Sequence, residues 1–182
     1  SINLVAVRVL AEVTPQAVVE FAKRLGISSE LDPSLALALG ASAVKPIELV
    51  NAYATFAAGG KYQPPRYIRG IQDAEGHAVP LPPPPAPTEV LSQAGAYLIT
   101  NLMTSVIQGG TGKAALSLKR PIAGKTGTSN KVRDAWFVGF TPELVTGVWV
   151  GYDDLRPLGS KESGANTALP IWIDIMKQAL KD

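Results

Sequence analysis

One short run of the sequence, Gly124-Lys125-Thr126-Gly127-Thr128, combines a cation, two hydroxyls and two glycines beside a stretch typical of a strand. Alternate side chains of a strand point to the same face, so Thr126 and Thr128 are expected to face one side together. Gly127 leaves the backbone open between them, and Lys125 adds a positive charge. This combination suits the binding of a peptide that ends in a carboxylate and lies along a sheet edge.

A phosphate-binding loop of the form Gly-x-x-x-x-Gly-Lys-Thr is the nearest alternative for a glycine followed by lysine. It requires a glycine five residues before Gly124, and Lys119 stands there. Gly112-Lys113 fails as well, because Ile107 occupies the required glycine position and Ala114 follows the lysine. The sequence therefore indicates no nucleotide loop.

A second motif, Ser1-Ile2-Asn3, has the form Ser-x-Asn. Ser-x-x-Lys, Ser-Asp-Asn and Lys-Thr-Gly are the three signatures of penicillin-binding proteins and class A β-lactamases. Two of the three are present here in the right order, with the middle residue of the second relaxed from Asp to Ile.

The chain resembles the transpeptidase domain of a class A (bifunctional) penicillin-binding protein, from residue 1 to about residue 180. Further segments carry this resemblance between and after the two motifs: Leu39-Gly40-Ala41, Pro46-Ile47-Glu48, residues 51–60, residues 110–115, residues 134–140 and residues 163–172. The resemblance implies an α+β fold, an antiparallel sheet packed with helices, of the penicillin-binding transpeptidase and serine β-lactamase kind. Residues 1–182 would form the C-terminal portion of one such domain.

In the family, the Ser-x-x-Lys element that supplies the nucleophile precedes the Ser-x-Asn motif, so its counterpart would lie upstream of Ser1. Ser42-Ala43-Val44-Lys45 has the right form but follows the Ser-x-Asn motif instead of preceding it. The chemistry needs serine and lysine one helical turn apart, and Pro46 biases Lys45 away from helical geometry. We therefore expect the nucleophilic serine upstream of this chain, and the chain alone to be unable to form an acyl-enzyme.

Composition excludes several classes of function. A net charge of +2 without a basic run gives no indication of a nucleic-acid partner. The absence of cysteine excludes thiol catalysis, disulfides and cysteine-ligated metal, and is compatible with an extracytoplasmic domain. The single histidine, His77, cannot build a histidine metal site, and it lies in a polar turn. No metal or cofactor is expected.

The spacing of apolar residues and turn residues predicts helices first and most strands later. Helices are expected over 5–13, from Thr14-Pro15 up to Gly26, and over 46–58, 92–108 and 169–180. Strand pairs are expected at 67–71 with 78–79, and at 136–140 with 144–152. The last strand is almost continuously apolar, which predicts burial on both faces.

Two further features concern prolines and tryptophans. Residues 80–87 contain six prolines in eight residues and are expected to be an extended polyproline segment on the surface. Trp149 and Trp172 lie in periodic apolar elements and are expected in the core. Trp136 closely follows the Lys-Thr-Gly motif and is expected to form a wall of the substrate groove.

The resemblance implies a peptidoglycan D,D-transpeptidase that crosslinks stem peptides through a serine acyl-enzyme and is acylated by β-lactams. Ser1 would relay a proton as a general acid and base, and Asn3 would hydrogen-bond the substrate's peptide carbonyl. Lys125 would supply positive potential, and Thr126 and Thr128 would hold the substrate carboxylate. These roles make Ser1, Asn3 and Lys125 the expected catalytic residues.

The substrate-binding residues implied by the resemblance are Thr126, Gly127, Thr128 and Trp136. The N–H of Thr128 would be one of two oxyanion donors, and a side chain at Gly127 would meet the substrate backbone. The partners would be stem peptides, β-lactams and an upstream region with Ser-x-x-Lys and a glycosyltransferase domain. The location would be extracytoplasmic, on the periplasmic face, with a membrane anchor upstream.

The sequence leaves open other protein classes and other roles for the motif residues. A class A β-lactamase would need a carboxylate that activates water, and Glu12, Glu20 and Glu30 have no recognisable context for that role. A class B penicillin-binding protein would share the chemistry, and a non-catalytic sensor of β-lactams or peptidoglycan would share the fold. Ser1 and Asn3 could simply cap the first helix, and the two threonines of the Lys-Thr-Gly-Thr run could be ordinary strand residues.

Overall fold

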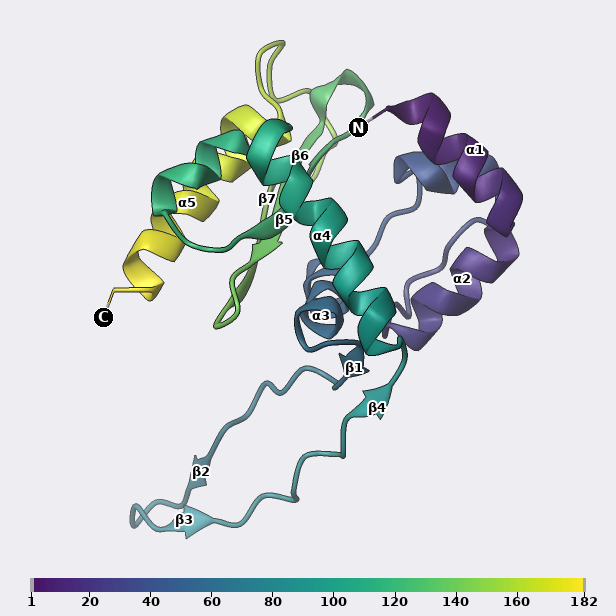
Figure 1. The fold of residues 1–182 in the computed structure, drawn as a ribbon. Helices are drawn as coiled ribbons and strands as arrows, with labels where there is room; N and C mark the ends of the chain where they lie inside the picture. Colours follow the sequence, from purple (N-terminus) through teal and green to yellow (C-terminus); the bar gives the residue numbers. More distant parts are fainter. Residues whose placement is uncertain (1, 182) are drawn as a thin grey trace.

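The computed structural model describes residues 2–181 and consists of a three-stranded antiparallel sheet between helices, with a long arm at one end (Figure 1). This arrangement confirms the predicted α+β class. The α-helices are α1 (Asn3–Val13), α2 (Pro15–Arg24), α3 (Pro46–Ala57), α4 (Gln93–Gly109) and α5 (Leu169–Ala179). Shorter helical segments are η1 (Leu35–Leu39), η2 (Lys113–Leu118), η3 (Asn130–Val132) and the π-helical η4 (Gly164–Ala168), which leads directly into α5.

The central sheet has the order β5-β6-β7, formed by β5 (Ala123–Thr128), β6 (Asp134–Phe140) and β7 (Val145–Gly151). Both pairs are antiparallel, and their register places Gly127 opposite Trp136 and Trp136 opposite Trp149. Because directly opposed residues share a face, Lys125, Trp136 and Trp149 lie on one face of the sheet. Thr126, Thr128 and Phe137 lie on the other.

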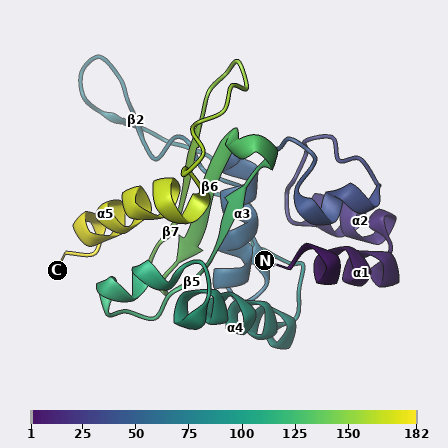
Figure 2. The ribbon, with the colours of Figure 1, turned by 90° about the horizontal axis from the view of Figure 1, so that it is seen from above.

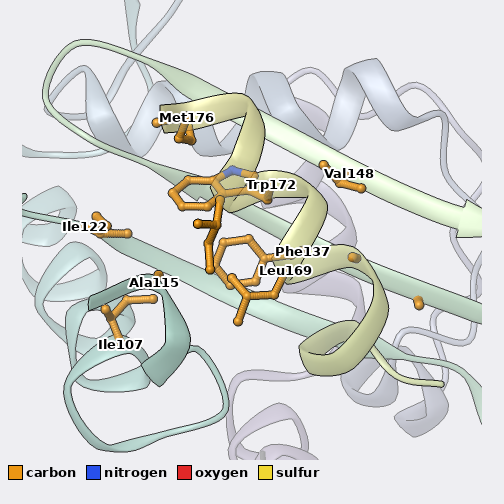
Figure 3. Packing of buried hydrophobic residues seen from close by; sticks show 11 residues of the cluster. Ile107, Ala115, Ile122, Phe137, Val148, Leu169, Trp172 and Met176 are labelled. Atoms are coloured by element: carbon orange, nitrogen blue, oxygen red, sulfur yellow. The ribbon is translucent and has the colours of Figure 1, made fainter. Parts of the chain in front are cut away.

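The face of the sheet that carries Phe137 is covered by η4 and α5 and holds the main core (Figure 3). Trp172 of α5 is fully buried, as predicted, and packs edge-on against Phe137 with 4.9 Å between ring centroids. The indole N–H of Trp172 donates to the carbonyl of Thr146 at 3.0 Å, which satisfies its one buried polar group. Met176 and Leu169 complete this layer, so α5 is fixed on the sheet by its apolar side.

The opposite face is covered by α3 and α4 (Figure 2). Met103 of α4 packs with Ala123 and Phe140 of the sheet. Val50 of α3 lies directly over Gly147, where an added Cβ would come within 2.4 Å of the Val50 side chain. Gly147 therefore lets α3 approach β7 closely.

The predicted starts of the helices have identifiable local causes. The side chain of Thr14 accepts a hydrogen bond from the N–H of Ala17, and Pro15 occupies the first turn of α2. Ser92 caps α4 in the same way, through the N–H of Gly95. α1 is different, because Ile2 occupies its N-cap position and no side chain caps its start.

A long arm, residues 63–87, extends away from the body (Figure 1). Its base is closed by the antiparallel pair of β1 (Lys61–Tyr62) and β4 (Thr88–Glu89). Farther out, β2 (Ile71–Gln72) pairs with β3 (Ala78–Val79), so the predicted strand over 67–71 is reduced to its end. Residues 80–87 contain no helix or strand and are exposed except at Leu81, which is intermediate.

Two predictions about the last strand are wrong. Trp149 is 40% exposed instead of lying in the core, and within β7 only Val148 is buried. The reason is positional: among residues 2–181, β7 pairs with β6 alone and forms one edge of the sheet. The Trp149 indole N–H instead donates to the carboxylate of Asp134 at 2.9 Å. An apolar run thus predicted burial that an edge strand does not provide.

Glu48, in the first turn of α3, clamps the loop that precedes the helix. Its carboxylate accepts hydrogen bonds from the backbone N–H and the hydroxyl of both Ser28 and Ser29, at 2.6–3.2 Å. The Lys45 ammonium adds a fifth contact at 3.2 Å. These donors, led by the Ser28 hydroxyl, lower the pKa of Glu48 to about 2 from 4.5.

We expect Glu48→Gln to destabilise the protein by about 1–2 kcal/mol, because the amide cannot accept all of these bonds and the site is partly solvent-screened. The pKa in the folded state is lowered, so the carboxylate stabilises the fold fully above pH 4.5 and loses this effect as the pH falls toward 2. Urea unfolding at pH 7 and at acidic pH measures both effects. Glu75→Gln, at the exposed tip of the arm, is the control. Equal stabilities of wild type and Glu48→Gln at pH 7 would contradict the clamp.

Candidate active site

The Lys-Thr-Gly-Thr run forms most of β5, which is an edge strand of the sheet among the described residues. Thr126 and Thr128 share one face, as the alternation predicts, and the Lys125 side chain starts from the other face. The run thus offers hydroxyls from one face and an ammonium from the other at the same edge. The geometry leaves this edge of β5 open to an added strand.

The backbone of β5 presents a donor at that edge. The N–H of Ser129 donates to the carbonyl of Asp134 on β6 at 3.1 Å. Successive N–H groups of a strand point to opposite sides, so the N–H of Thr128 points away from β6, toward the unpaired edge. The same alternation turns the N–H and carbonyl of Thr126 to that edge.

Lys125 is half-buried, and its ammonium bends toward the strand edge. Nζ donates to the carbonyl of Thr126 at 2.8 Å and lies 3.5 Å from the Thr126 hydroxyl oxygen. Burial lowers the pKa of Lys125, because removing water from around an ammonium disfavours its charged form. The group is therefore a cation held beside the threonine hydroxyls and able to lose its proton more readily than a surface lysine.

Both threonine hydroxyls of β5 have partners on neighbouring elements. The Thr126 oxygen lies 2.6 Å from the hydroxyl oxygen of Thr111, in the turn after α4. The Thr128 oxygen accepts the N–H of Gly164, the first residue of η4, at 3.1 Å. Thr111 and Gly164 belong to segments that carry the family resemblance, but the sequence predicts no role at the site for either of them. The glycines that flank Thr111 are the one local signal of a tight turn there.

Gly164 and Gly127 allow a close approach of backbone to backbone. A Cβ added to Gly164 would lie 2.4 Å from the Trp136 carbonyl oxygen and 2.5 Å from the Gly127 carbonyl oxygen. A Cβ at Gly127 would come within 3.1 Å of Trp136 Cβ. Packing against Trp136 therefore gives one reason for glycine at position 127, and the expected contact with the substrate backbone gives another.

Trp136 lies on the same sheet face as Lys125 and is partly exposed. Its ring is 6.3 Å from that of Trp149, at an angle of 44°. The two indoles form an aromatic surface next to the Lys125 end of the site. The groove-wall role expected of Trp136 stays a prediction.

Of the Ser-x-Asn motif, Ser1 lies outside the described residues. Asn3 is the first residue of α1 and is exposed. Ile2 occupies the N-cap position, so the alternative in which Asn3 caps the helix is wrong. Both ribbon views place the start of α1 toward the sheet, with the body of the helix leading away from it (Figures 1 and 2).

Residues 1–177 match the family described as "Penicillin binding protein transpeptidase domain". The chain belongs to this family. Among curated relatives, Penicillin-binding protein 1A of Rickettsia prowazekii is 39% identical over 202 residues, which cover 99% of this chain and 26% of that protein. Penicillin-binding protein 1A of Aquifex aeolicus is 43% identical over 177 residues, 97% of this chain and 24% of the relative. The transpeptidase-domain chain thus spans about a quarter of the length of these relatives.

Solved structures of penicillin-binding proteins have the same fold. Penicillin-binding protein 1A of Haemophilus influenzae superposes with a TM-score of 0.92 at 34% identity, over 99% of this chain and 33% of that chain. PonA1 of Mycobacterium tuberculosis, in complex with penicillin V, gives a TM-score of 0.80 at 30% identity, over 92% of this chain and 50% of that one. The predicted resemblance to a class A transpeptidase domain is confirmed.

Within this transpeptidase domain, Ser42 and Lys45 do not form a Ser-x-x-Lys site. Neither residue is helical, and α3 begins only at Pro46. The Ser42 oxygen accepts the N–H of Asp32 at 3.1 Å, whereas the Lys45 ammonium contacts Glu48 and Ser28. Ser42 and Lys45 thus contact different residues and not each other's partners, which agrees with the interpretation of Ser42-Ala43-Val44-Lys45 as a chance match.

A cavity of the transpeptidase-domain chain lies away from β5. It has a volume of about 870 Å³, between α3 and the base of the arm, and it contains neither motif. The chemistry-bearing residues instead lie along an open strand edge. Within residues 2–181 there is no helix of the length and apolarity that a bilayer span requires.

Proposed function

We propose that residues 1–182 form the C-terminal portion of one transpeptidase domain, which crosslinks peptidoglycan stem peptides and is acylated by β-lactams. The observation that carries the proposal is the β5 edge, where the Lys125 ammonium, two threonine hydroxyls and the outward N–H of Thr128 meet. A carboxylate and a peptide carbonyl are the groups that such an edge would bind. The family membership supports the same activity.

The proposed reaction is a two-step acyl transfer. A serine hydroxyl from the segment upstream of this chain attacks the carbonyl of the penultimate D-alanine. A serine ester forms, the peptide bond breaks, and the terminal D-alanine leaves as a free amine whose nitrogen has taken up the serine proton. The amine of a second stem peptide then attacks the ester, the ester bond breaks as the crosslinking amide forms, and a proton of that amine passes to the serine oxygen.

In this scheme Ser1 relays a proton between the active-site lysines and the leaving nitrogen. The positive charge of Lys125 keeps Ser1 effective and attracts the substrate carboxylate. Asn3 donates a hydrogen bond to the substrate's peptide carbonyl and holds the upstream lysine. The lowered pKa of Lys125 suits a group that lies beside a proton-transfer step.

Thr126 and Thr128 hold the terminal carboxylate of the stem peptide through their hydroxyls, and Gly127 leaves room for its backbone. The N–H of Thr128 donates to the developing oxyanion, together with a second donor from the upstream segment. Trp136 forms the wall of the groove on the Lys125 face of the sheet. A β-lactam binds in the same place and remains at the ester stage.

The partners proposed for the whole protein come from the family resemblance, and the coverage of only about a quarter of the 1A relatives is compatible with them. An upstream part carries Ser-x-x-Lys, a glycosyltransferase domain and a membrane anchor, which place this domain on the extracytoplasmic face. The present chain alone lacks the nucleophile and does not form an acyl-enzyme.

The test is to label the full-length protein with a fluorescent penicillin and to map the modified peptide. We expect one adduct, on a serine upstream of Ser1, and none on the isolated 182-residue chain. An adduct on Ser42 would overturn the rejection of that site. Absence of any adduct would contradict the transpeptidase proposal and favour a binding or sensing module.

A further inference from the structure

The turn between α4 and η2 brings a third hydroxyl to the β5 edge. Thr111 Oγ1 lies 2.6 Å from Thr126 Oγ1, within the range of a strong O–H···O hydrogen bond. Thr111 itself is exposed, so no burial requirement accounts for this pairing. The contact joins a residue of the turn to a substrate-binding residue proposed above.

The turn places Thr111 beside β5 through close packing on α4. The N–H groups of Gly110 and Gly112 both donate to the carbonyl of Val106, at 3.1 and 3.0 Å. A Cβ on Gly110 would come within 2.9 Å of that carbonyl oxygen, and one on Gly112 within 2.7 Å of the Ile107 side chain. The two glycines therefore let the turn pack closely on the last turn of α4, which brings Thr111 between them to the side of β5.

Each threonine hydroxyl has one proton to donate, and the contacts at the β5 edge determine which of these protons remain available to a ligand. Thr128 Oγ1 already accepts the N–H of Gly164, so its own O–H is free to donate to a ligand. Thr126 and Thr111 share one hydrogen bond, so one of their two protons is used between them and the other is free. The edge thus offers two hydroxyl donors, which matches the two oxygens of one carboxylate.

The direction of the shared bond decides which group faces the ligand. A carboxylate only accepts hydrogen bonds, so a Thr126 whose proton pointed to Thr111 would present only lone pairs to it. When Thr111 donates instead, Thr126 Oγ1 accepts that bond and its own proton turns to the carboxylate. The Lys125 ammonium, 3.5 Å from the same oxygen, supports the same direction because a cation also favours its lone pair.

We propose that Thr111 is a positioning residue for carboxylate recognition: its hydroxyl donates to Thr126 Oγ1 and thereby aims the Thr126 proton at the terminal carboxylate of the stem peptide or β-lactam. This inference rests on the proposed transpeptidase function and adds a residue to its carboxylate site.

The experiment measures second-order acylation rate constants of the full-length protein with a penicillin and with its methyl ester. The ester keeps the reactive ring but removes the negative charge. We expect Thr111→Val to lower the rate with the penicillin about tenfold, as for loss of one hydrogen bond to a charged group, and to leave the rate with the ester within about twofold. Thr111→Ser should restore the wild-type rate.

Thr104→Val is the matched control, because the Thr104 hydroxyl donates to the carbonyl of Thr100 within α4 and not to a residue of β5. Thr111→Ala deletes the hydroxyl without a branched side chain and replaces the valine variant if that variant does not fold. Equal losses with penicillin and ester, or no loss with penicillin, would overturn the role of Thr111. Absence of acylation in the wild type would instead overturn the transpeptidase function together with this inference.

Discussion

Replacing Lys125 with alanine in the full-length protein is expected to lower the rate of penicillin acylation by about 100- to 1,000-fold. The ammonium is the positive group that the structure holds at the β5 edge, 2.8 Å from the Thr126 carbonyl and 3.5 Å from its hydroxyl. Its loss removes both the attraction for the carboxylate and the charge that the proposed proton relay requires. Stopped-flow acylation with a fluorescent penicillin measures the effect.

Folding should remain largely intact in this variant, because burial disfavours the charged form of Lys125 and alanine removes that cost. Lys131→Ala is the control, since Lys131 is an exposed lysine in the segment between β5 and β6. Wild-type acylation by Lys125→Ala would mean that the Lys-Thr-Gly run is not part of the active site.

Replacing Gly164 with alanine is expected to lower acylation about 100-fold and to cost about 1–3 kcal/mol of stability. The new Cβ would overlap the carbonyl oxygens of Trp136 and Gly127, which are backbone atoms and cannot swing away. Either η4 moves off the sheet or β5 shifts relative to β6. Both movements displace the Thr128 hydroxyl, which accepts the Gly164 N–H, and the oxyanion donor beside it.

Thermal melts and acylation rates of the same preparations separate the two effects. Gly109→Ala is the matched control, because an added Cβ at Gly109, the last residue of α4, meets no atom within 4 Å. Acylation at the wild-type rate by a Gly164→Ala protein would show that the close packing of η4 on β5 does not position the site.

The sequence predicted those parts of the fold that depend on local patterns. The hairpin of β6 and β7, the capped start of α2 at Thr14 and the burial of Trp172 follow from periodicity and turn residues within one segment. The shared face of Thr126 and Thr128 follows from strand alternation alone. These features need no knowledge of what lies across the molecule.

The features that were missed depend on position in the sheet or on contacts between distant segments. Trp149 belongs to an apolar run, but whether such a run is central or at an edge depends on strand order. The contacts of Thr111 with Thr126 and of Gly164 with Thr128 join residues 15 and 36 positions apart. Glycine at 110, 112 and 164 is visible in the sequence, whereas the atoms that each one approaches are not.

Both ends of the arm of residues 63–87 join the body at one place, beside α3. The β1–β4 pair closes its base, and the Asn51 side chain donates to the Gln63 carbonyl just above it. Because the cost of closing a loop grows only slowly with its length, residues beyond this point can be added or removed with little effect on the sheet. The arm is therefore the part of the molecule where related proteins are free to diverge in length, and where a reporter could be inserted without disturbing the β5 edge.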